Sequence, residues 1–175
     1  MADEDPINRG NGSDEPGTDP QVGMITQYIK DLSVESLSAP QAFQWQTQPQ
    51  LEVQFNINVQ KIADEVHEVT LKIEAAARSD QGVHFLVDLS FAGLYGLRNF
   101  PDEALPPFLL IEAPRMLFPF ARQIIADATM HTGFPPLLLE PIDFGSAYMA
   151  QLQAQEEQAE PEIDEPLPSD SPSKE

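Results

Sequence analysis

The sequence predicts an α+β fold, in which a four-stranded antiparallel sheet is followed by two helices packed on one of its faces. Three observations favour it. Residues 51–61 alternate strictly between apolar and polar side chains, short polar turns separate the next two alternating runs, and apolar residues recur at helical spacing only after residue 102. Strands that come first and helices that come last are typical of layered α+β proteins.

The first predicted strand spans residues 24–35, where β-branched and aromatic residues alternate loosely with polar ones. This alternation predicts that Tyr28 and Leu32 share one face and that Asp31 and Glu35 share the other. The glycines after residue 92 predict that the chain leaves the sheet there. Three further strands, joined by short turns into an antiparallel meander, are predicted at 51–61, 66–78 and 83–92.

A long connection, residues 36–49, separates the first two predicted strands. It has no periodicity, and prolines stand on either side of Phe43 and of Trp45, the only tryptophan in the chain. Long loops carry function more often than short ones. Two interpretations stay open: the aromatic side chains pin the connection to the core, or they wall a binding groove.

Helical structure is predicted from about residue 102 to residue 130, with Asp102 as the N-cap and with kinks at Pro114 and Pro119. A glycine and several prolines after residue 132 end this helix. Asp143 is predicted to cap a last helix, because apolar residues then recur four positions apart at Phe144, Tyr148 and Leu152.

The segment between the two predicted helices, residues 133–144, is unusually apolar for a loop. Its prolines forbid a helix, yet it carries a phenylalanine and a run of leucines. Loops normally run over the surface. Either a neighbouring subunit covers this segment, or it is a binding surface for something apolar.

Both ends of the chain are acidic and rich in proline, glycine and serine, which predicts disordered tails at residues 1–23 and 153–175 around one domain at 24–152. The formal net charge is −20 and no basic patch is present, so nucleic-acid binding is disfavoured. The chain has no cysteine, which excludes disulfides. The acidic start is unlike a signal peptide, and no apolar run reaches the ~20 residues of a membrane span. A soluble, cytoplasmic protein without membrane insertion is expected.

The sequence contains no specific catalytic signal. A glycine-rich phosphate loop, a metalloprotease HExxH motif and a nucleophile motif are all missing, so no enzyme activity and no cofactor are expected. His67 and His84 fall on adjacent predicted strands, where they are either a two-histidine metal site or, far more commonly, ordinary satisfied or exposed histidines. Acids on the sheet face away from the helices are either a solvated surface or a docking surface for a basic partner.

Five segments carry a resemblance to a known family. They are QYIKDLSVE with the following AP and FQ (27–44), DEVHEVTLKIE (64–74), HFLVDLSFAGLYGL (84–97), LFPFAR (117–122) and GFPPLLLEPIDF (133–144). In these segments, and in the order of four strands and two helices, the sequence resembles the SecB family of protein-export chaperones. LFPFAR followed by GFPPLLLEPIDF is the most specific part of the resemblance.

The resemblance implies a homotetramer, arranged as a dimer of dimers, that acts as an ATP-independent holdase. Such a chaperone keeps unfolded secretory precursor proteins in a translocation-competent state and delivers them to the translocase motor SecA. An oligomer with a structural or adaptor role, whose apolar loops are sealed at subunit contacts, is the alternative from another class.

The resemblance also implies roles for particular residues. It implies a client groove lined by the connection 36–49 and the segment 133–144, with Phe43, Trp45, Phe134, Leu137, Leu138, Leu139, Ile142 and Phe144. It implies a SecA-docking surface formed by Asp31, Glu35, Leu86 and Asp88. It implies an oligomer interface that includes Val87, Leu89, Phe91, Leu117 and Ile124.

Overall fold

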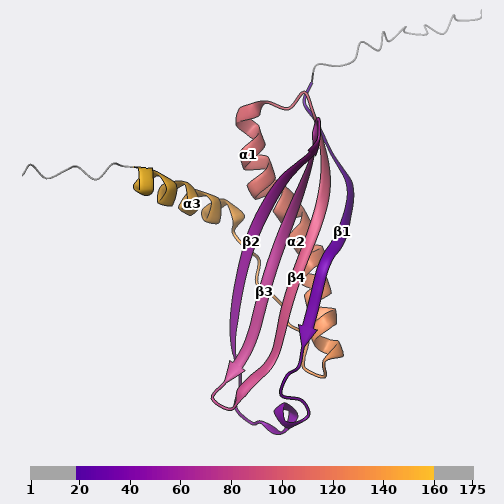
Figure 1. Ribbon diagram of the computed structural model, residues 1–175, viewed down its shortest axis with the longest axis vertical. Helices are drawn as coiled ribbons and strands as arrows, with labels where there is room; N and C mark the ends of the chain where they lie inside the picture. Colours follow the sequence, from indigo (N-terminus) through magenta and orange to yellow (C-terminus); the bar gives the residue numbers. More distant parts are fainter. Residues whose placement is uncertain (1–18, 160–175) are drawn as a thin grey trace, which may run out of the picture.

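The computed structural model describes residues 19–159, so residues 1–18 and 160–175 of the tails predicted at 1–23 and 153–175 lie outside the described residues. One four-stranded sheet, in the order β1-β4-β3-β2 with antiparallel neighbours throughout, forms its centre (Figure 1). The predicted meander of the last three strands is confirmed, and β1 pairs with its β4 edge. The strands are β1 Gln21–Glu35, β2 Gln50–Ala63, β3 Val66–Ser79 and β4 Gly82–Arg98.

The helical segment begins with three short turns and continues as one regular helix. These elements are η2 Asp102–Ala104, α1 Leu105–Pro107, η3 Phe108–Glu112 and α2 Ala113–His131. Asp102 makes no capping hydrogen bond and Pro101 holds the N-cap position, so the predicted cap is wrong. The π-turn η3 ends at Glu112, two residues before Pro114. A wider turn accommodates a proline, which has no N–H and would collide with the carbonyl four residues back.

Strand β4 is longer than predicted, because its glycine-rich second half stays in the sheet. Gly93 pairs with Gln27 of β1, and the ladder continues to Arg98. A Cβ at Gly93 would come within 2.9 Å of Leu117 Cδ2 on α2, so glycine lets the helix approach the sheet here. The prediction that the chain leaves the sheet after residue 92 is therefore wrong. Strand β1 likewise starts at Gln21, inside the predicted tail.

Strand β1 contains two bulges, one after Met24 and one at Lys30. Each bulge adds one residue to β1 and so exchanges the faces to which the following side chains point. Tyr28 pairs with Ala92 of β4, and its hydroxyl reaches the same sheet face that carries Asp31. The prediction that Tyr28 shares a face with Leu32 is wrong for this reason.

The last helix, α3, spans Phe144–Ala159 and so extends past Leu152, where the predicted domain ends. Asp143 caps it as predicted, because its Oδ1 accepts the backbone N–H of Ser146 at 3.0 Å and its Oδ2 accepts the Ser146 hydroxyl at 2.8 Å. These hydrogen bonds hold the pKa of the Asp143 carboxyl below its ordinary value. Beyond its first turn α3 projects away from the sheet (Figure 1).

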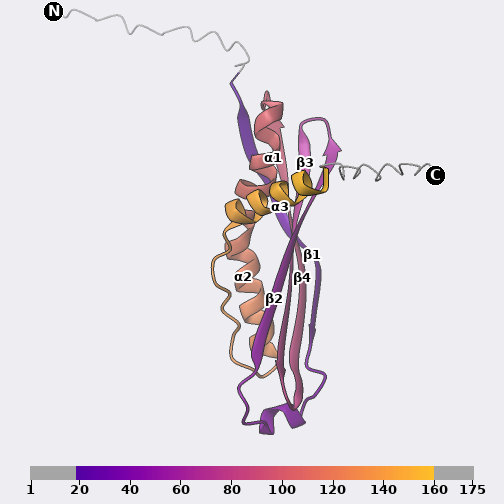
Figure 2. The same cartoon turned by 90° about the vertical axis from the view of Figure 1, so that its left-hand side faces the viewer.

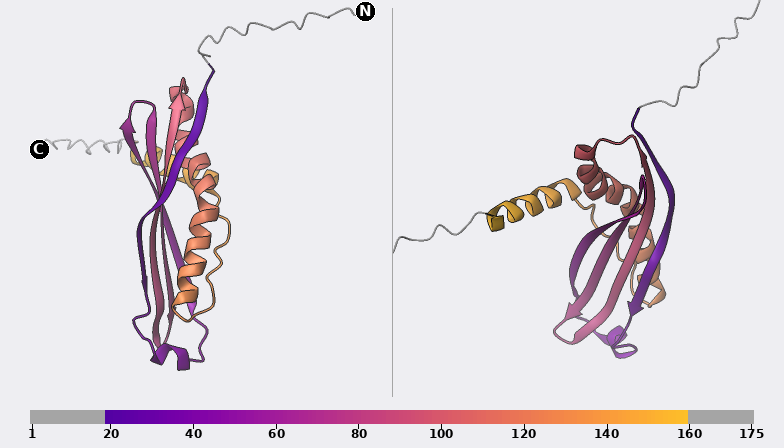
Figure 3. Two further views of the ribbon diagram at one scale, coloured as in Figure 1. Left: turned by 90° about the vertical axis from the view of Figure 1, so that its right-hand side faces the viewer. Right: turned by 45° about the horizontal axis from the view of Figure 1, so that its top comes forward.

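The core lies between the sheet and α2, which confirms the predicted α+β layers. Seen edge-on, α2 covers one face of the sheet, and no α-helix of the described residues covers the opposite face (Figure 2). The segment after α2 runs back beside that helix (Figure 3). No helix in the described part of the chain is long and apolar enough to span a membrane. The largest fully buried side chains of this core are Tyr95, Phe144, Leu71, Ile73, Leu89, Leu117, Ile125 and Val69.

Candidate functional site

An apolar hollow of about 800 Å³ opens where the connection 36–49 meets the segment 133–144. The connection crosses beneath one end of the sheet from β1 to β2 and contains the short helix η1, Gln41–Gln44 (Figure 1). Phe43 and Trp45 line the hollow from the connection, and Phe134 and Leu137 line it from the segment. The structure therefore brings together the two parts of the sequence that had no obvious place in the core.

Aromatic contacts hold the two walls of this hollow. The rings of Phe43 and Phe134 lie 5.2 Å apart, and Trp45 lies edge-on to His84 at 4.9 Å. Such contacts contribute about 0.5–1.5 kcal/mol each beyond their buried area. His84 Nε2 is 3.0 Å from Ser79 Oγ, which satisfies the ring nitrogen. Both interpretations of the connection hold, since its aromatic side chains fasten it and also face the hollow.

The segment is also fastened to the end of α2 by a backbone hydrogen bond. The buried hydroxyl of Thr129 accepts the N–H of Leu137 at 2.9 Å. The same hydroxyl lies 2.9 Å from the carbonyl of Ile125, to which it donates. This tie positions the leucines that follow against β2.

The hollow continues along β2 toward α3. A second hollow of about 410 Å³ lies between Leu51, Val53 and Phe55 of β2 and residues 138–143, and it shares Leu51 with the first. A third, of about 310 Å³, shares Phe55 with the second and ends at Tyr148 of α3. We call the three hollows together the apolar trough, because each shares a lining residue with the next; Asn56 and Gln151 make its third part more polar. An extended peptide fits such a shape, because its side chains can enter successive hollows.

All but one of the predicted groove residues line the apolar trough. Phe144 is only 1% exposed and packs between Phe55 at 5.8 Å and Phe118 at 6.1 Å. It supports the trough from beneath, so the prediction that it faces a ligand is wrong. The lining residues are Phe43, Trp45, Phe134, Leu137, Leu138, Leu139 and Ile142.

Sequence reasoning missed Leu51, Val53 and Phe55, which it assigned to the covered side of the sheet. They are 46%, 40% and 38% exposed. The reason is that β2 is an edge strand and α2 packs mainly over β3 and β4. The alternation of β2 carries no signal for this, because a strand covered on one face and a half-covered edge strand alternate in the same way.

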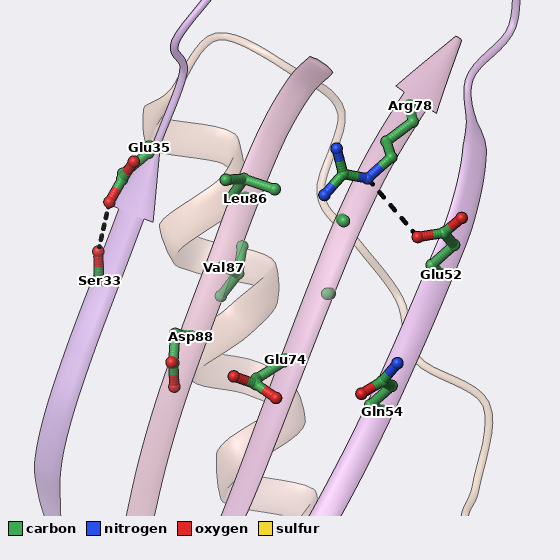
Figure 4. Close-up of a pocket in the computed structure, with 11 residues that line it drawn as sticks. Ser33, Glu35, Glu52, Gln54, Glu74, Arg78, Leu86, Val87 and Asp88 are labelled. Atoms are coloured by element: carbon green, nitrogen blue, oxygen red, sulfur yellow. Dashed lines mark hydrogen bonds and ion pairs between the residues drawn. The ribbon is translucent and has the colours of Figure 1, made fainter. Parts of the chain in front are cut away.

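The sheet face without α-helices carries an acidic hollow of about 380 Å³ (Figure 4). The apolar side chain of Leu86 also lines this hollow. Asp31 lies on the same sheet face further along β1, opposite Ser90. The predicted docking residues are therefore gathered on one face, which we call the acidic face. Carboxylates from all four strands border the hollow: Glu35 of β1, Asp88 of β4, Glu74 of β3 and Glu52 of β2.

Two cations partly neutralise the carboxylates around this hollow. Lys72 Nζ lies 2.9 Å from Glu74 and 3.2 Å from Asp88, and these carboxylates, Glu74 first, raise the pKa of Lys72. Arg78 pairs with Glu52 at 3.5 Å. Acids outnumber bases among the residues that line the hollow, so its potential favours a cationic ligand.

Glu68 is a buried carboxylate on the same sheet face. Its Oε1 lies 2.5 Å from Lys30 Nζ, and its Oε2 accepts a hydrogen bond from the Tyr28 hydroxyl. These donors, Lys30 first, hold the pKa of Glu68 below its ordinary value, and the hydrogen bond to Glu68 raises the pKa of Tyr28.

We expect Glu68→Gln to lower the free energy of unfolding by about 2–3 kcal/mol at pH 7. The pKa of Glu68 is lower in the folded state than in the unfolded chain. Its stabilising contribution is therefore fully present above the ordinary value of 4.5 and is lost as the pH falls through the folded-state pKa. The difference between wild type and variant in urea unfolding should shrink below pH 4.5.

A matched control is Glu112→Gln, which breaks an exposed pair with Arg115 at 2.8 Å. It should change the free energy of unfolding by less than about 0.5 kcal/mol across the same pH range. A Glu68→Gln difference that does not vary with pH would contradict the role of the ionised carboxylate.

Most of the predicted oligomer-interface residues lie inside the single chain. Val87, Leu89, Phe91 and Leu117 are at most 5% exposed between β4 and α2, and Ile124 packs against the same core. Side chains buried within one chain cannot contact a second copy, so the prediction is wrong for these four; Ile124 is only partly buried, and its interface role stays a prediction. The apolar side chains exposed on β1 and α2 are Val22, Ile25, Ile29, Leu32, Met116 and Phe120.

Because Leu89 is fully buried, we expect Leu89→Ala to lower the free energy of unfolding by about 2–5 kcal/mol. Urea unfolding followed by circular dichroism measures this loss. The exposed control Ile62→Ala should stay within about 0.5 kcal/mol of wild type. An unchanged midpoint for Leu89→Ala would mean that the side chain is not part of the core.

The two-histidine metal site is not formed. His67 pairs with Tyr95 at one end of the sheet, whereas His84 lies beside Ser79 at the other end. Within residues 19–159 no group of three or more His, Cys, Asp or Glu side chains could hold a metal ion. Burial, with a smaller contribution from Lys61, lowers the pKa of His67.

The fold and the site together define a class of protein: a small α+β scaffold with a peptide-sized apolar trough on one side and an acidic face on the other. The family model for SecB, preprotein translocase subunit, matches residues 15–155. The chain therefore belongs to the SecB family, which confirms the resemblance. SecB is a family of chaperones rather than of enzymes.

Curated relatives agree over most of the chain. The protein-export protein SecB of Sphingopyxis alaskensis is 51% identical over 160 residues, which cover 88% of this chain and 91% of the relative. The protein of the same name from Zymomonas mobilis is 53% identical over 137 residues, or 78% of this chain and 84% of the relative.

A solved structure supports the fold. The SecB-like chaperone Rv1957 of Mycobacterium tuberculosis, in complex with a ChAD peptide from the HigA1 antitoxin, matches with a TM-score of 0.58. The match covers 69% of this chain and 90% of that chain at 17% sequence identity. At this identity the similarity concerns the fold alone.

Proposed function

We propose that the protein is an ATP-independent holdase, which binds unfolded precursor proteins in the apolar trough and keeps them competent for translocation. The observation that carries this proposal is the continuity of the trough, in which Leu51 and Phe55 each line two successive hollows. A folded protein has buried its apolar segments, whereas an unfolded one exposes them. A trough of apolar side chains therefore selects for exposure rather than for a particular sequence.

Binding of this kind needs no nucleotide. Apolar burial contributes about 25 cal/mol per Å² before the cost of ordering the client is subtracted. A ligand that prefers the unfolded state shifts the folding equilibrium of the client toward that state by mass action. The chaperone cycle then depends on handing the client over rather than on hydrolysis, and no cofactor is part of the proposal.

The proposed partner at the acidic face is the translocase motor SecA. Glu35, Leu86 and Asp88 border one hollow and Asp31 lies on the same face, which suits a basic segment that also carries an apolar side chain. The trough and the acidic face lie on opposite sides of the sheet, because Leu51 and Val53 line the one and Glu52 and Gln54, which alternate with them along β2, line the other. Client and motor can therefore be bound at the same time without a clash.

The proposed assembly is a homotetramer, a dimer of dimers, in the cytoplasm. Its contacts use the exposed apolar side chains of the edge strand β1 and of α2 instead of the buried residues predicted from the sequence. Ile25 and Ile29 on β1 are 59% and 47% exposed, and Phe120 on α2 is 50% exposed. Several troughs on one assembly would let a long client bind at more than one point and gain avidity.

The alternative is a structural oligomer whose apolar segments are sealed at subunit contacts. Leu138, at 65% exposure in the single chain, is the side chain that such an assembly would have to cover. The deciding experiment adds the purified protein, without ATP, to a slow-folding precursor that is refolding from denaturant. Retarded refolding at a stoichiometric amount of assembled protein supports the holdase. Unretarded refolding, with the assembly verified by mass measurement in solution, supports the structural oligomer.

A further inference from the structure

Glu68 is unusual because it is a buried charge on the sheet face that no α-helix covers. Only 6% of the residue is exposed, although its strand neighbours on this face, Lys72 and Glu74, reach solvent. The side chains that cover Glu68 come from β1, which is two strands away in the sheet order β1-β4-β3. Tyr28 and Lys30 reach over β4 to the carboxylate.

These two contacts lie at the second bulge of β1. Ile29 pairs with Phe91 and Asp31 pairs with Ser90, which leaves Lys30 as the extra residue without a ladder partner. The backbone of an extra residue is not fixed by the ladder. The edge position of β1 adds to this freedom, because a strand on its other side is lacking within the described chain. The position of the bulge therefore depends on the contacts that the side chains around it make.

The bulge decides which side chains face outward. Because side chains alternate along a strand, losing the extra residue would shift every later residue of β1 by one position and turn its side chain to the other face. With the extra residue at Lys30, Asp31 and Glu35 lie on the acidic face and Leu32 pairs with Leu89 toward the core. The identity of the acidic face thus depends on where this bulge sits.

We propose that Glu68 is a positioning residue, which fixes the bulge at Lys30 and thereby presents Asp31 and Glu35 on the acidic face. It does so by binding one donor before the bulge, the Tyr28 hydroxyl, and one at the bulge, the Lys30 ammonium. The Thr70 hydroxyl, 3.4 Å away on β3, steadies the carboxylate. The consequence for the basic partner rests on the proposed function of the acidic face.

The register of β1 can be read by disulfide trapping, since the chain has no cysteine of its own. The native pair is Asp31→Cys with Ser90→Cys, which are directly opposite in the ladder. The shifted pair is Leu32→Cys with Asp88→Cys, which come opposite each other only when the extra residue at Lys30 is lost and the later part of β1 slips by one residue. Directly opposite side chains have Cβ atoms about 4.5–5.5 Å apart, close enough for a disulfide after a small adjustment.

We expect Glu68→Gln to slow trapping of the native pair on the order of tenfold and to raise trapping of the shifted pair, because charge-assisted hydrogen bonds at the bulge are lost. Lys30→Met should act in the same direction, and Lys30→Arg should restore native trapping. Glu112→Gln, the control on the helical side, should change neither pair. Native trapping that is unchanged in both Glu68→Gln and Lys30→Met, under conditions where both remain folded, would overturn the proposal.

A second readout separates this proposal from the function of the acidic face. Binding of SecA is measured to the Glu68→Gln variant without the cysteines. Reduced binding together with reduced native trapping supports both the positioning role and the docking face. Reduced trapping with unchanged binding supports the positioning role and argues against SecA docking at Asp31 and Glu35.

Discussion

Replacing Leu51, Val53 and Leu138 with serine is expected to weaken the binding of an unfolded client by about 100-fold or more, because each lost apolar contact contributes about 1–1.5 kcal/mol. All three side chains line the apolar trough and are at least 40% exposed. Their replacement should therefore leave the free energy of unfolding nearly unchanged. Titration of a labelled, unfolded precursor measures the affinity, and urea unfolding verifies the fold.

The chain offers a closely matched control for one of these positions. Leu37 is 65% exposed, as is Leu138, but it lies in the connection and lines none of the three hollows. Leu138→Ser should weaken client binding about tenfold, whereas Leu37→Ser should stay within about twofold. Equal losses would mean that exposed apolar surface in general, and not the trough, captures the client. Leu139 is unsuitable for this test, because it is only 4% exposed and its replacement would disturb the core.

Asp31→Asn combined with Asp88→Asn is expected to weaken binding to SecA by about 10–100-fold and to leave client binding intact. Asp31 is exposed, and Asp88 is joined to Lys72, which keeps its second partner Glu74 in the variant. The loss should diminish as salt is raised, because exposed charges are screened. Calorimetric titration with SecA, and separately with an unfolded precursor, gives the two affinities.

The control for this variant must change the net charge equally at a different place. Glu112→Gln with Asp127→Asn does so on the helical side, where Glu112 pairs with Arg115 and Asp127 accepts a hydrogen bond from Gln123. It should alter the SecA affinity by less than about threefold, as expected of long-range electrostatics at physiological salt. Similar losses in both double variants would show that net charge, and not the acidic face, determines binding.

The layer pattern could be predicted because alternation and helical spacing are local properties of the sequence. The strict alternation of β2 and the Asp143 cap are of this kind, and both are present. The bulges of β1 could not be predicted, because an extra residue in a ladder leaves no mark in composition. Gly93 was read as an exit from the sheet, yet it stays in the ladder because α2 packs closely against it.

The candidate site was predictable in part for a different reason. The connection 36–49 and the segment 133–144 stood out because their aromatic and leucine side chains had no periodic element to belong to, and they line the apolar trough. The side chains of Leu51 and Val53 did not stand out, because a half-covered edge strand and a buried strand have the same alternation. The interface residues failed because Leu89 and Leu117 are needed by the core of one chain.

Strand β2 has a role in both surfaces. Its Leu51 and Val53 line the trough, while Glu52 and Gln54, which alternate with them, border the acidic hollow on the other side. A client that shifts β2 would therefore also shift Glu52 and Gln54 on the acidic face, because one strand carries both sets of side chains. Thermodynamic linkage makes such an effect reciprocal: a motor that favours one position of β2 changes the affinity for the client by the same factor as the client changes the affinity for the motor. In the proposed function, this one strand would couple release of the client to binding of the motor.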